Sequence, residues 1–222
     1  MDINSLSTQV PHQVITKLTE EGINELRPAQ EKAIAAGLLD SENLLICTPT
    51  ASGKTLIAEL AATKTILNNQ GKAIYIVPLV ALASEKAKEF RRKWGGLFRI
   101  ALSVGDFDSA DPHLAEYDLI ICTAEKLDSL LRHHAHWLSQ VSLVVVDEIH
   151  LLNDVSRGPT LEIIITLLRQ LIPEMQIIGL SATIGNPKEL ADWLDAKLIE
   201  DNWRPVPLHQ GVYFDGEIQF KD

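Results

Sequence analysis

The sequence predicts an α/β fold in which a mainly parallel sheet carries helices on both of its faces. Short runs of β-branched and aliphatic residues alternate with helix-length stretches along the whole chain. These runs are apolar nearly throughout, which is typical of strands buried on both faces of a parallel sheet. With 222 residues, 46% of them hydrophobic and 23% charged, the chain suits one large domain, and disordered, collagen-like and disulfide-scaffold classes are excluded.

The predicted strands and helices alternate in sequence. The expected strands are NLLIC at 43–47, KAIYIV at 72–77, FRIALSV at 98–104, YDLIICT at 117–123, SLVVVD at 142–147 and MQIIGLS at 175–181. The expected helices cover 31–39, 54–69, 81–94, 124–133, 160–172 and 186–194. The last of them has Asn186 as N-cap and Pro187 in its first turn. Because right-handed crossovers put every strand-to-helix loop at the carboxyl edge of a parallel sheet, we expect a ligand to bind at that edge.

Charge and cysteine usage narrow the class of protein. The formal net charge of −10 argues against strong non-specific nucleic-acid binding by this chain alone. The basic segment at 86–94 is interpreted as the solvated face of a helix, with a local nucleic-acid-binding groove as the alternative. HHAHW at 133–137 is interpreted as a solvated helix end rather than a metal site. Cys47 and Cys122 each end an apolar run, which predicts reduced, half-buried thiols. The sequence shows no leader-like segment and no apolar run of membrane length, so we expect a cytoplasmic, intracellular protein without membrane contact.

The segment TPTASGKT at 48–55 lies where a predicted buried strand meets a long predicted helix. A phosphate there would meet backbone N–H groups, the positive end of a helix, the Lys54 ammonium and the Thr55 hydroxyl, which is able to hold Mg²⁺. The usual G-x-x-x-x-G-K-[ST] pattern has glycine where this chain has Thr48, so a plain turn remains the alternative. The predicted nucleotide-binding residues of the segment are Thr50, Ala51, Ser52, Gly53, Lys54 and Thr55.

Two further strand ends carry polar residues. VVVDEIH at 144–150 delivers two adjacent carboxylates, of which one can hold Mg²⁺ while the other orients or deprotonates a water. An acidic turn without a catalytic role is the alternative. The phosphate loop about ninety residues earlier favours the catalytic role, since we expect the strands at 43–47 and 142–147 to be neighbours in the sheet. GLSAT at 179–183 places Ser181 and Thr183 after another strand, where they either hydrogen-bond the Asp-Glu strand end or simply end a strand.

These three segments, in this order, resemble motifs I, II and III of superfamily 2 helicases of the DExH branch. LRPAQ at 26–30, PLVALASEK at 78–86 and TAEKLDSLLR at 123–132 resemble the adenine-reading segment, motif Ia and motif Ib of that family. SVGDFDS (103–109), DEIHLLND (147–154), RGPTLE (157–162) and NWRPVPL (202–208) are most similar to the archaeal DNA repair helicases known for Holliday-junction migration, kin to the helicase part of animal DNA polymerase theta. The resemblance implies a RecA-like P-loop NTPase domain in a prokaryotic cell.

The resemblance also implies cofactors, partners and residue roles. ATP and Mg²⁺ would be the cofactors, and single-stranded or branched DNA, with RNA less favoured, the partner. Gln30 would read adenine, Lys54 would contact the β and γ phosphates, Thr55 and Asp147 would hold Mg²⁺, and Glu148 would position or activate the hydrolytic water, so that Lys54, Asp147 and Glu148 are the predicted catalytic residues. His150, Ser181 and Thr183 would couple the nucleotide state to DNA binding, and Pro78, Leu79, Thr123 and Lys126 would contact nucleic acid.

The predicted domain organisation is that of a first motor domain. Residues 1–25 would form an N-terminal helical extension, 26–208 the motor domain, and 209–222 the start of a connection to a second RecA-like domain that we expect to be missing. Because that domain supplies an arginine finger worth about 10³–10⁵ in rate, we expect the chain alone to bind nucleotide weakly and hydrolyse it slowly. Position 80 is Val80, where similar helicases commonly have arginine, so this segment would grip DNA through backbone N–H groups and neighbouring side chains.

Other readings of the same motifs define the alternatives. A related RNA helicase shares these motifs, and an isolated nucleotide-binding module with negligible turnover is a further possibility for the chain alone. A phosphate-loop kinase or transporter ATPase ranks far behind, because such proteins lack the SAT segment and the adenine-reading glutamine upstream of the loop.

Overall fold

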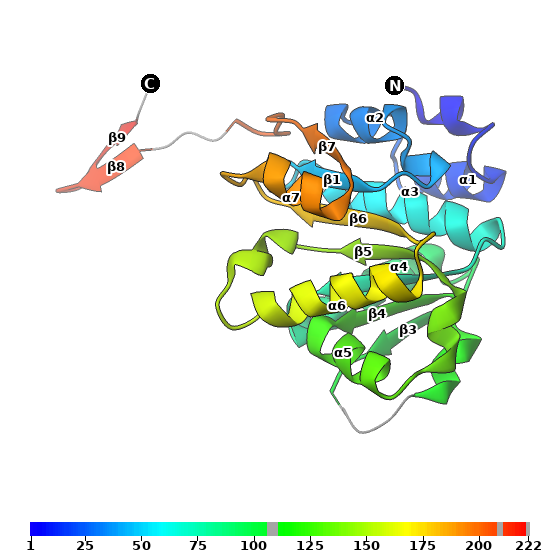
Figure 1. Cartoon of the computed structure of the whole chain (residues 1–222). Coiled ribbons are helices and arrows are strands. Elements are labelled where there is room, and N and C mark those ends of the chain that lie inside the picture. Colours follow the sequence, from blue (N-terminus) through cyan, green and yellow to red (C-terminus); the bar gives the residue numbers. More distant parts are fainter. Residues whose placement is uncertain (106–110, 208–210, 221–222) are drawn as a thin grey trace.

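The computed structural model of the chain describes residues 1–105, 111–207 and 211–220. At its centre lies a seven-stranded parallel sheet with the strand order β3-β4-β2-β5-β6-β1-β7 (Figure 1). The strands are β1 (Leu44–Cys47), β2 (Lys72–Val77), β3 (Ile100–Ser103), β4 (Leu119–Thr123), β5 (Val141–Val146), β6 (Gln176–Ser181) and β7 (Lys197–Glu200). The predicted fold class, a mainly parallel sheet with helices on both faces, is confirmed.

The helices follow the predicted alternation. They are α1 (His12–Glu20), α2 (Pro28–Ala35), α3 (Lys54–Leu67), α4 (Val80–Trp94), α5 (Ala124–Arg132), α6 (Gly158–Leu171) and α7 (Pro187–Leu194). The 3₁₀ helices are η1 (Ile3–Leu6), η2 (Leu38–Asp40), η3 (Pro112–Glu116), η4 (His136–Gln140) and η5 (Ile149–Asn153). The helix predicted at 31–39 ends earlier, because Gly37 adopts a left-handed φ of 101° and begins the separate turn η2. Asn186 is the N-cap residue of α7, but its side chain amide donates to Glu189 and does not cap the helix backbone.

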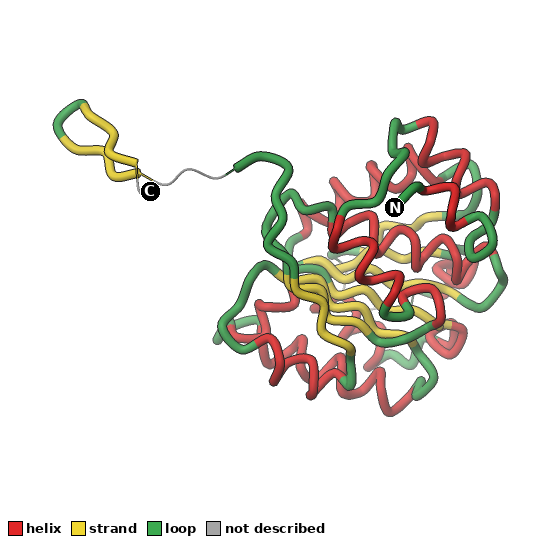
Figure 2. The backbone as a smooth tube through the Cα atoms, turned by 90° about the horizontal axis from the view of Figure 1, so that it is seen from above, coloured by secondary structure: helices red, strands yellow, loops and turns green. Residues whose placement is uncertain are grey.

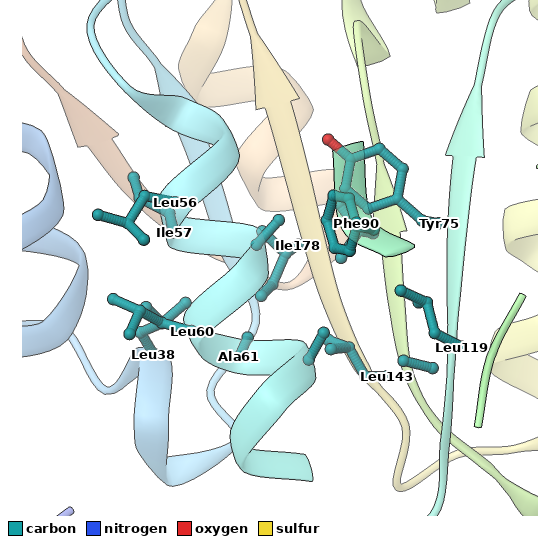
Figure 3. Close-up of a cluster of buried hydrophobic side chains, with 14 of the residues drawn as sticks. Leu38, Leu56, Ile57, Leu60, Ala61, Tyr75, Phe90, Leu119, Leu143 and Ile178 are labelled. Carbon is teal, nitrogen blue, oxygen red and sulfur yellow. The ribbon is translucent and has the colours of Figure 1, made fainter. Parts of the chain in front are cut away.

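Side chains of successive strand residues enter two separate cores, one on each face of the sheet. Leu44, Ile46 and Tyr75 belong to the core beneath α1 to α4, whereas Leu45 and Cys47 belong to the core beneath α5, α6 and α7. Figure 2 shows the helices flanking the strands on both sides, and Figure 3 shows part of the first core, where α3 packs on the sheet. Burial on both faces explains why the strands read as continuous apolar runs.

Two expectations about the sheet need correction. β7 was not predicted: its sequence KLIE has one buried residue, Ile199, and it pairs with β1 at the edge of the sheet. The strands β1 and β5 are not neighbours, because β6 lies between them. All six residues of β6 are buried, as an interior strand requires.

The terminal segments differ in how they pack. Ile3, Leu6 and Val14 of the first 25 residues are buried in the same core as α3. The strands β8 (Gly211–Phe214) and β9 (Glu217–Phe220) form an antiparallel hairpin in which every residue is exposed. The domain limits at 25 and 208 stay predictions, and the predicted boundary at 208–210 and most of the SVGDFDS segment lie outside the described residues. Within the described ranges, no helix has the length and apolar character needed to cross a membrane.

Candidate nucleotide site

Three neighbouring strands end together and carry the predicted nucleotide motifs. β1 leads into the loop at 48–53, β5 into Asp147 and Glu148, and β6 ends at Ser181. The backbone N–H of Thr48 donates to the Ser181 carbonyl oxygen at 3.2 Å, which joins two of these strand ends. Residues far apart in the sequence therefore meet at the carboxyl edge, where a ligand is expected.

The loop between β1 and α3 requires its glycine. Gly53 has a φ of 92°, and a Cβ built there would lie 2.5 Å from Nε2 of Gln30. Thr48, which replaces the usual first glycine of the pattern, is fully buried, and its hydroxyl hydrogen-bonds that of Ser52 at 2.7 Å. The Thr48 side chain is thus accommodated inside the loop. Because α3 begins at Lys54, its unpaired N–H groups and the positive end of its dipole lie at the loop.

Lys54 lies over the loop that precedes it. Its ammonium donates to the carbonyl oxygen of Thr48 at 2.8 Å and approaches that of Pro49 at 3.5 Å. Burial lowers the pKa of Lys54, while the nearby carboxylates of Glu148 and Asp147 oppose this shift. The three predicted catalytic residues are therefore close enough to interact electrostatically.

Gln30 at the first turn of α2 is fixed to the loop. Its side chain is buried, its Nε2 donates to the Gly53 carbonyl oxygen at 3.0 Å, and its Oε1 accepts from the Arg27 backbone N–H at 2.8 Å. The Arg27 guanidinium donates to the Ala51 carbonyl oxygen at 2.7 Å and lies 5.3 Å from the ring centre of Trp203. A pocket of about 670 Å³ opens beside these residues, a volume usual for small-molecule sites.

Asp147 and Glu148 have different surroundings. The half-buried Asp147 accepts two hydrogen bonds, from the Tyr75 hydroxyl to Oδ2 at 2.9 Å and from the Glu148 backbone N–H to Oδ1 at 3.0 Å. Glu148 adopts a left-handed φ of 52°, which is uncommon for a residue other than glycine, and its side chain is 39% exposed. The Asp147 carboxylate is held in place and the Glu148 carboxylate reaches solvent, and their roles stay predictions.

The oxygen atoms of Thr55 and Asp147 fit the predicted Mg²⁺ site. Hydroxyl and carboxylate oxygens are the ligands that Mg²⁺ prefers. The Thr55 hydroxyl oxygen accepts a hydrogen bond from the Lys86 ammonium at 3.0 Å, so this oxygen already faces a cation of the protein itself. Both residues stay predicted ligands.

The predicted coupling residues lie around the same edge. His150 Nδ1 is 3.3 Å from Glu148 Oε2, and Ser181 is fully buried beside Cys47 in the β1–β6 register. Thr183 is exposed beyond the end of β6. In the described part of the chain, no hydrogen bond joins Ser181 or Thr183 to the Asp-Glu strand end, and their coupling role stays a prediction.

The residues predicted to contact nucleic acid divide into two pairs. Leu79 is 43% exposed and the adjacent Pro78 is half-buried. Thr123, by contrast, is buried and caps α5 by accepting a hydrogen bond from the Lys126 backbone N–H. The Lys126 side chain is 2% exposed, and its ammonium lies 2.8 Å from the Asp111 carboxylate. Both side chains are therefore bonded within the fold in this structure, and their contact with nucleic acid stays a prediction.

Two other expectations are corrected in part. The segment 86–94 is not uniformly solvated: Lys93 is buried and pairs with Glu59 at 2.5 Å across α3 and α4. Cys47 and Cys122 are fully buried rather than half-buried. The three histidines of HHAHW are exposed as expected, and the described residues contain no group of three His, Cys, Asp or Glu side chains that could hold a metal.

Sequence reasoning missed three residues that surround the site: Arg27, Tyr75 and Lys86. Tyr75 is the one aromatic residue in the strand KAIYIV and is flanked on both sides by isoleucine, a signal that points to its hydroxyl. Lys86 belongs to the basic run predicted to be solvated and ends the segment PLVALASEK, and Arg27 lies in LRPAQ, three residues before Gln30. Their partners are non-local, so spacing alone did not reveal them.

Comparison with known proteins identifies the family. The family model "DEAD/DEAH box helicase" matches residues 27–190. The chain is 55% identical over 206 residues to the ATP-dependent DNA helicase Hel308 of Pyrococcus abyssi, and 56% identical over 215 residues to that of Methanocaldococcus jannaschii. The match to the Pyrococcus abyssi protein covers 92% of this chain but only 28% of that protein. The match to the Methanocaldococcus jannaschii protein covers 93% of this chain and 18% of that protein.

A solved structure supports the same assignment. The DUF1998 helicase MrfA bound to DNA superimposes with a TM-score of 0.77 at 27% identity, covering 87% of this chain and 30% of that one. A second structure of MrfA, bound to DNA and AMPPNP, gives a TM-score of 0.76 at 27% identity, covering 87% of this chain and 29% of that one. The family model spans most of the chain and includes the phosphate loop and the Asp-Glu strand end. The chain belongs to the DEAD/DEAH box helicase family.

Proposed function

We propose that this chain is the ATP-binding first motor domain of an ATP-dependent DNA helicase that acts in DNA repair or recombination. The observation that carries the proposal is the meeting of Lys54, Thr55, Asp147 and Glu148 at one edge of the sheet, at the N-terminus of α3. Fold likeness alone would not support an activity. The site supplies the groups that phosphoryl transfer to water needs.

Each residue has a physical role in this proposal. The loop N–H groups and the α3 dipole bind the phosphates, and Lys54 exchanges its hydrogen bonds with the Thr48 and Pro49 carbonyl oxygens for phosphate oxygens. Thr55 and Asp147 would hold Mg²⁺, which neutralises charge on the phosphates when bound. Glu148, with its partly exposed carboxylate, orients the attacking water and accepts its proton.

The adenine side of the site lies at Gln30. The buried amide of this residue is fixed by Gly53 and Arg27 at the rim of the pocket. A base that hydrogen-bonds to the Gln30 amide would replace its bonds to Gly53 or Arg27. Base recognition and the position of the loop are therefore linked through this one side chain. The discrimination of adenine from guanine therefore depends on which hydrogen bonds this amide gains and loses.

DNA is the proposed nucleic-acid substrate for two reasons. The two relatives that are 55% and 56% identical to this chain over the matched residues are named DNA helicases, and the MrfA structures contain DNA. The chain spans 28% of the Pyrococcus abyssi relative, so helicase activity is proposed for a longer protein with a second motor domain and accessory domains. We expect that second domain to supply an arginine finger, which is typically worth about 10³–10⁵ in rate.

The experiment is a steady-state ATPase measurement on this chain with Mg²⁺, alone, with single-stranded DNA and with single-stranded RNA of matched sequence. The same measurement is made on the longer protein. We expect slow turnover by the chain and fast, DNA-stimulated turnover by the longer protein. Stimulation by RNA but not by DNA would replace the proposal by an RNA helicase, and ATP binding without turnover in either protein would leave a nucleotide-binding module.

A further inference from the structure

The carboxylate of Asp147 is oriented by Tyr75, which lies outside every segment of the chain that resembles a helicase motif. Its Oδ2 atom accepts a hydrogen bond from the Tyr75 hydroxyl at 2.9 Å, and its Oδ1 atom accepts one from the Glu148 backbone N–H at 3.0 Å. With one donor on each oxygen, the plane of the carboxylate is fixed. A ligand held by second-layer hydrogen bonds presents its remaining lone pairs in one direction.

Tyr75 is itself held rigidly. It lies in the middle of β2, paired in parallel register with Val145, and is completely buried. Its ring packs edge-to-face on Phe90 of α4, with ring centres 5.5 Å apart and an interplanar angle of 66°. Figure 3 shows the two rings side by side, with the hydroxyl oxygen of Tyr75 at the end of the ring away from Leu119 and Leu143.

The same helix contacts the other predicted ligand. Lys86 lies one turn before Phe90 on α4, and its ammonium donates to the Thr55 hydroxyl oxygen at 3.0 Å. A cation on that oxygen would face the Lys86 charge at close range, and like charges repel. Glu89, whose carboxylate lies 3.2 Å from the ammonium, gives Lys86 an alternative partner.

We propose that Tyr75 and Lys86 are opposing positioning residues of the Mg²⁺ site: Tyr75 orients the Asp147 carboxylate for the metal, and Lys86 competes with the metal for the Thr55 hydroxyl. This inference rests on the proposed function, because it takes Thr55 and Asp147 as the metal ligands. Lys86 lies on α4, and Tyr75 lies on β2 and packs against Phe90 of α4. Metal affinity therefore depends on how α4 packs against the sheet.

The test is the Mg²⁺ dependence of nucleotide binding, measured with a fluorescent ATP analogue on the whole chain. Tyr75→Phe removes only the hydroxyl, and we expect the half-saturating Mg²⁺ concentration to rise by roughly tenfold or more, as for loss of other second-layer partners. Lys86→Met removes the competing charge, and we expect that concentration to fall severalfold. Binding in EDTA should match the wild type for both variants.

Two matched variants control for general effects. Tyr117→Phe removes a hydroxyl from the residue that follows η3, two positions before β4, and Lys88→Met removes an exposed charge from the same helix as Lys86. Neither should change the Mg²⁺ dependence, and thermal unfolding should show that all four variants are folded.

The results distinguish a failure of this inference from a failure of the proposed function. If the wild type shows Mg²⁺-dependent binding and Tyr75→Phe behaves identically, the inference is wrong while the proposed function stands. If the half-saturating Mg²⁺ concentration rises in both variants, Lys86 does not oppose the metal, and if it falls in both, Tyr75 does not support the metal; either result shows that the inference is wrong. If the wild type binds no nucleotide at any Mg²⁺ concentration, the proposed function fails and the inference fails with it.

Discussion

Two regions lie along the same carboxyl edge and differ in how their polar side chains are used. At the ends of β1 and β5, Lys54 and Glu148 remain partly exposed and converge on the loop. At the end of β4, Thr123 and Lys126 are buried and bonded within the fold, and the exposed side chains after β2 are the apolar Leu79 and Val80. A polar residue in a helicase motif can therefore face the ligand edge, as Lys54 and Glu148 do, or be bonded within the fold, as Thr123 and Lys126 are.

The largest expected effect concerns the nucleotide region. Glu148→Gln removes the proposed base and keeps the size of the side chain, so turnover in the longer protein should fall roughly 10²–10⁴-fold while ATP binding remains. Single-turnover ATPase kinetics and equilibrium binding together measure this split. Undiminished turnover would remove Glu148 from the mechanism.

The next prediction concerns the scaffold role at the end of β4. Lys126→Met removes the buried ammonium that lies 2.8 Å from the partly buried Asp111 carboxylate, so we expect the free energy of unfolding to fall by about 3–5 kcal/mol. Urea unfolding measures this change, with the exposed Lys188→Met as the control. An unchanged unfolding midpoint together with weaker DNA binding would return Lys126 to the nucleic-acid contacts.

The cysteines offer a chemical comparison of the two regions, since Cys47 is the last residue of β1 and Cys122 is the last residue but one of β4. Burial and the nearby Glu200 raise the pKa of Cys47 to about 11, and burial raises the pKa of Cys122 to about 12. At pH 8 both thiols are protonated, with about one Cys47 in a thousand as thiolate, so alkylation of the folded protein should be slow. Mass spectrometry after timed alkylation checks this, and rapid labelling of either thiol would show that its strand end opens.

The smallest effect is expected at Val80, which is 52% exposed. Val80→Arg adds a charge where similar helicases commonly have arginine, and we expect modestly tighter single-stranded DNA binding. The salt dependence should steepen by about 0.7 in the logarithmic slope for one new phosphate contact, with stability nearly unchanged. A slope equal to that of the wild type would show that the strand does not pass this position.

The sequence predicted the parts of this structure that depend on local pattern. Strands buried on both faces, the helix start after Gly53 and the Asp-Glu pair at a strand end all follow from residue types at fixed spacing. The pairing of Tyr75 with Asp147, of Lys86 with Thr55 and of Lys126 with Asp111 did not follow, because each pair joins segments that only the packing of α4, α5 and the sheet brings together. The position of β6 between β5 and β1 did not follow either, because the residues of a strand do not determine which strands lie beside it.

The central claim, that the loop at 48–55 binds the phosphates of a nucleotide, is tested most directly by isothermal titration of this chain with ATP. The titration is made with Mg²⁺ and in EDTA, for the wild type and for Lys54→Ala. We predict saturable binding by the wild type, stronger with Mg²⁺, and a loss of at least about tenfold in affinity for Lys54→Ala, since a hydrogen bond to a charged group contributes about 1.5–3 kcal/mol. Equal affinity for both proteins, or no binding by the wild type, would contradict the claim and leave the loop as a turn between a strand and a helix.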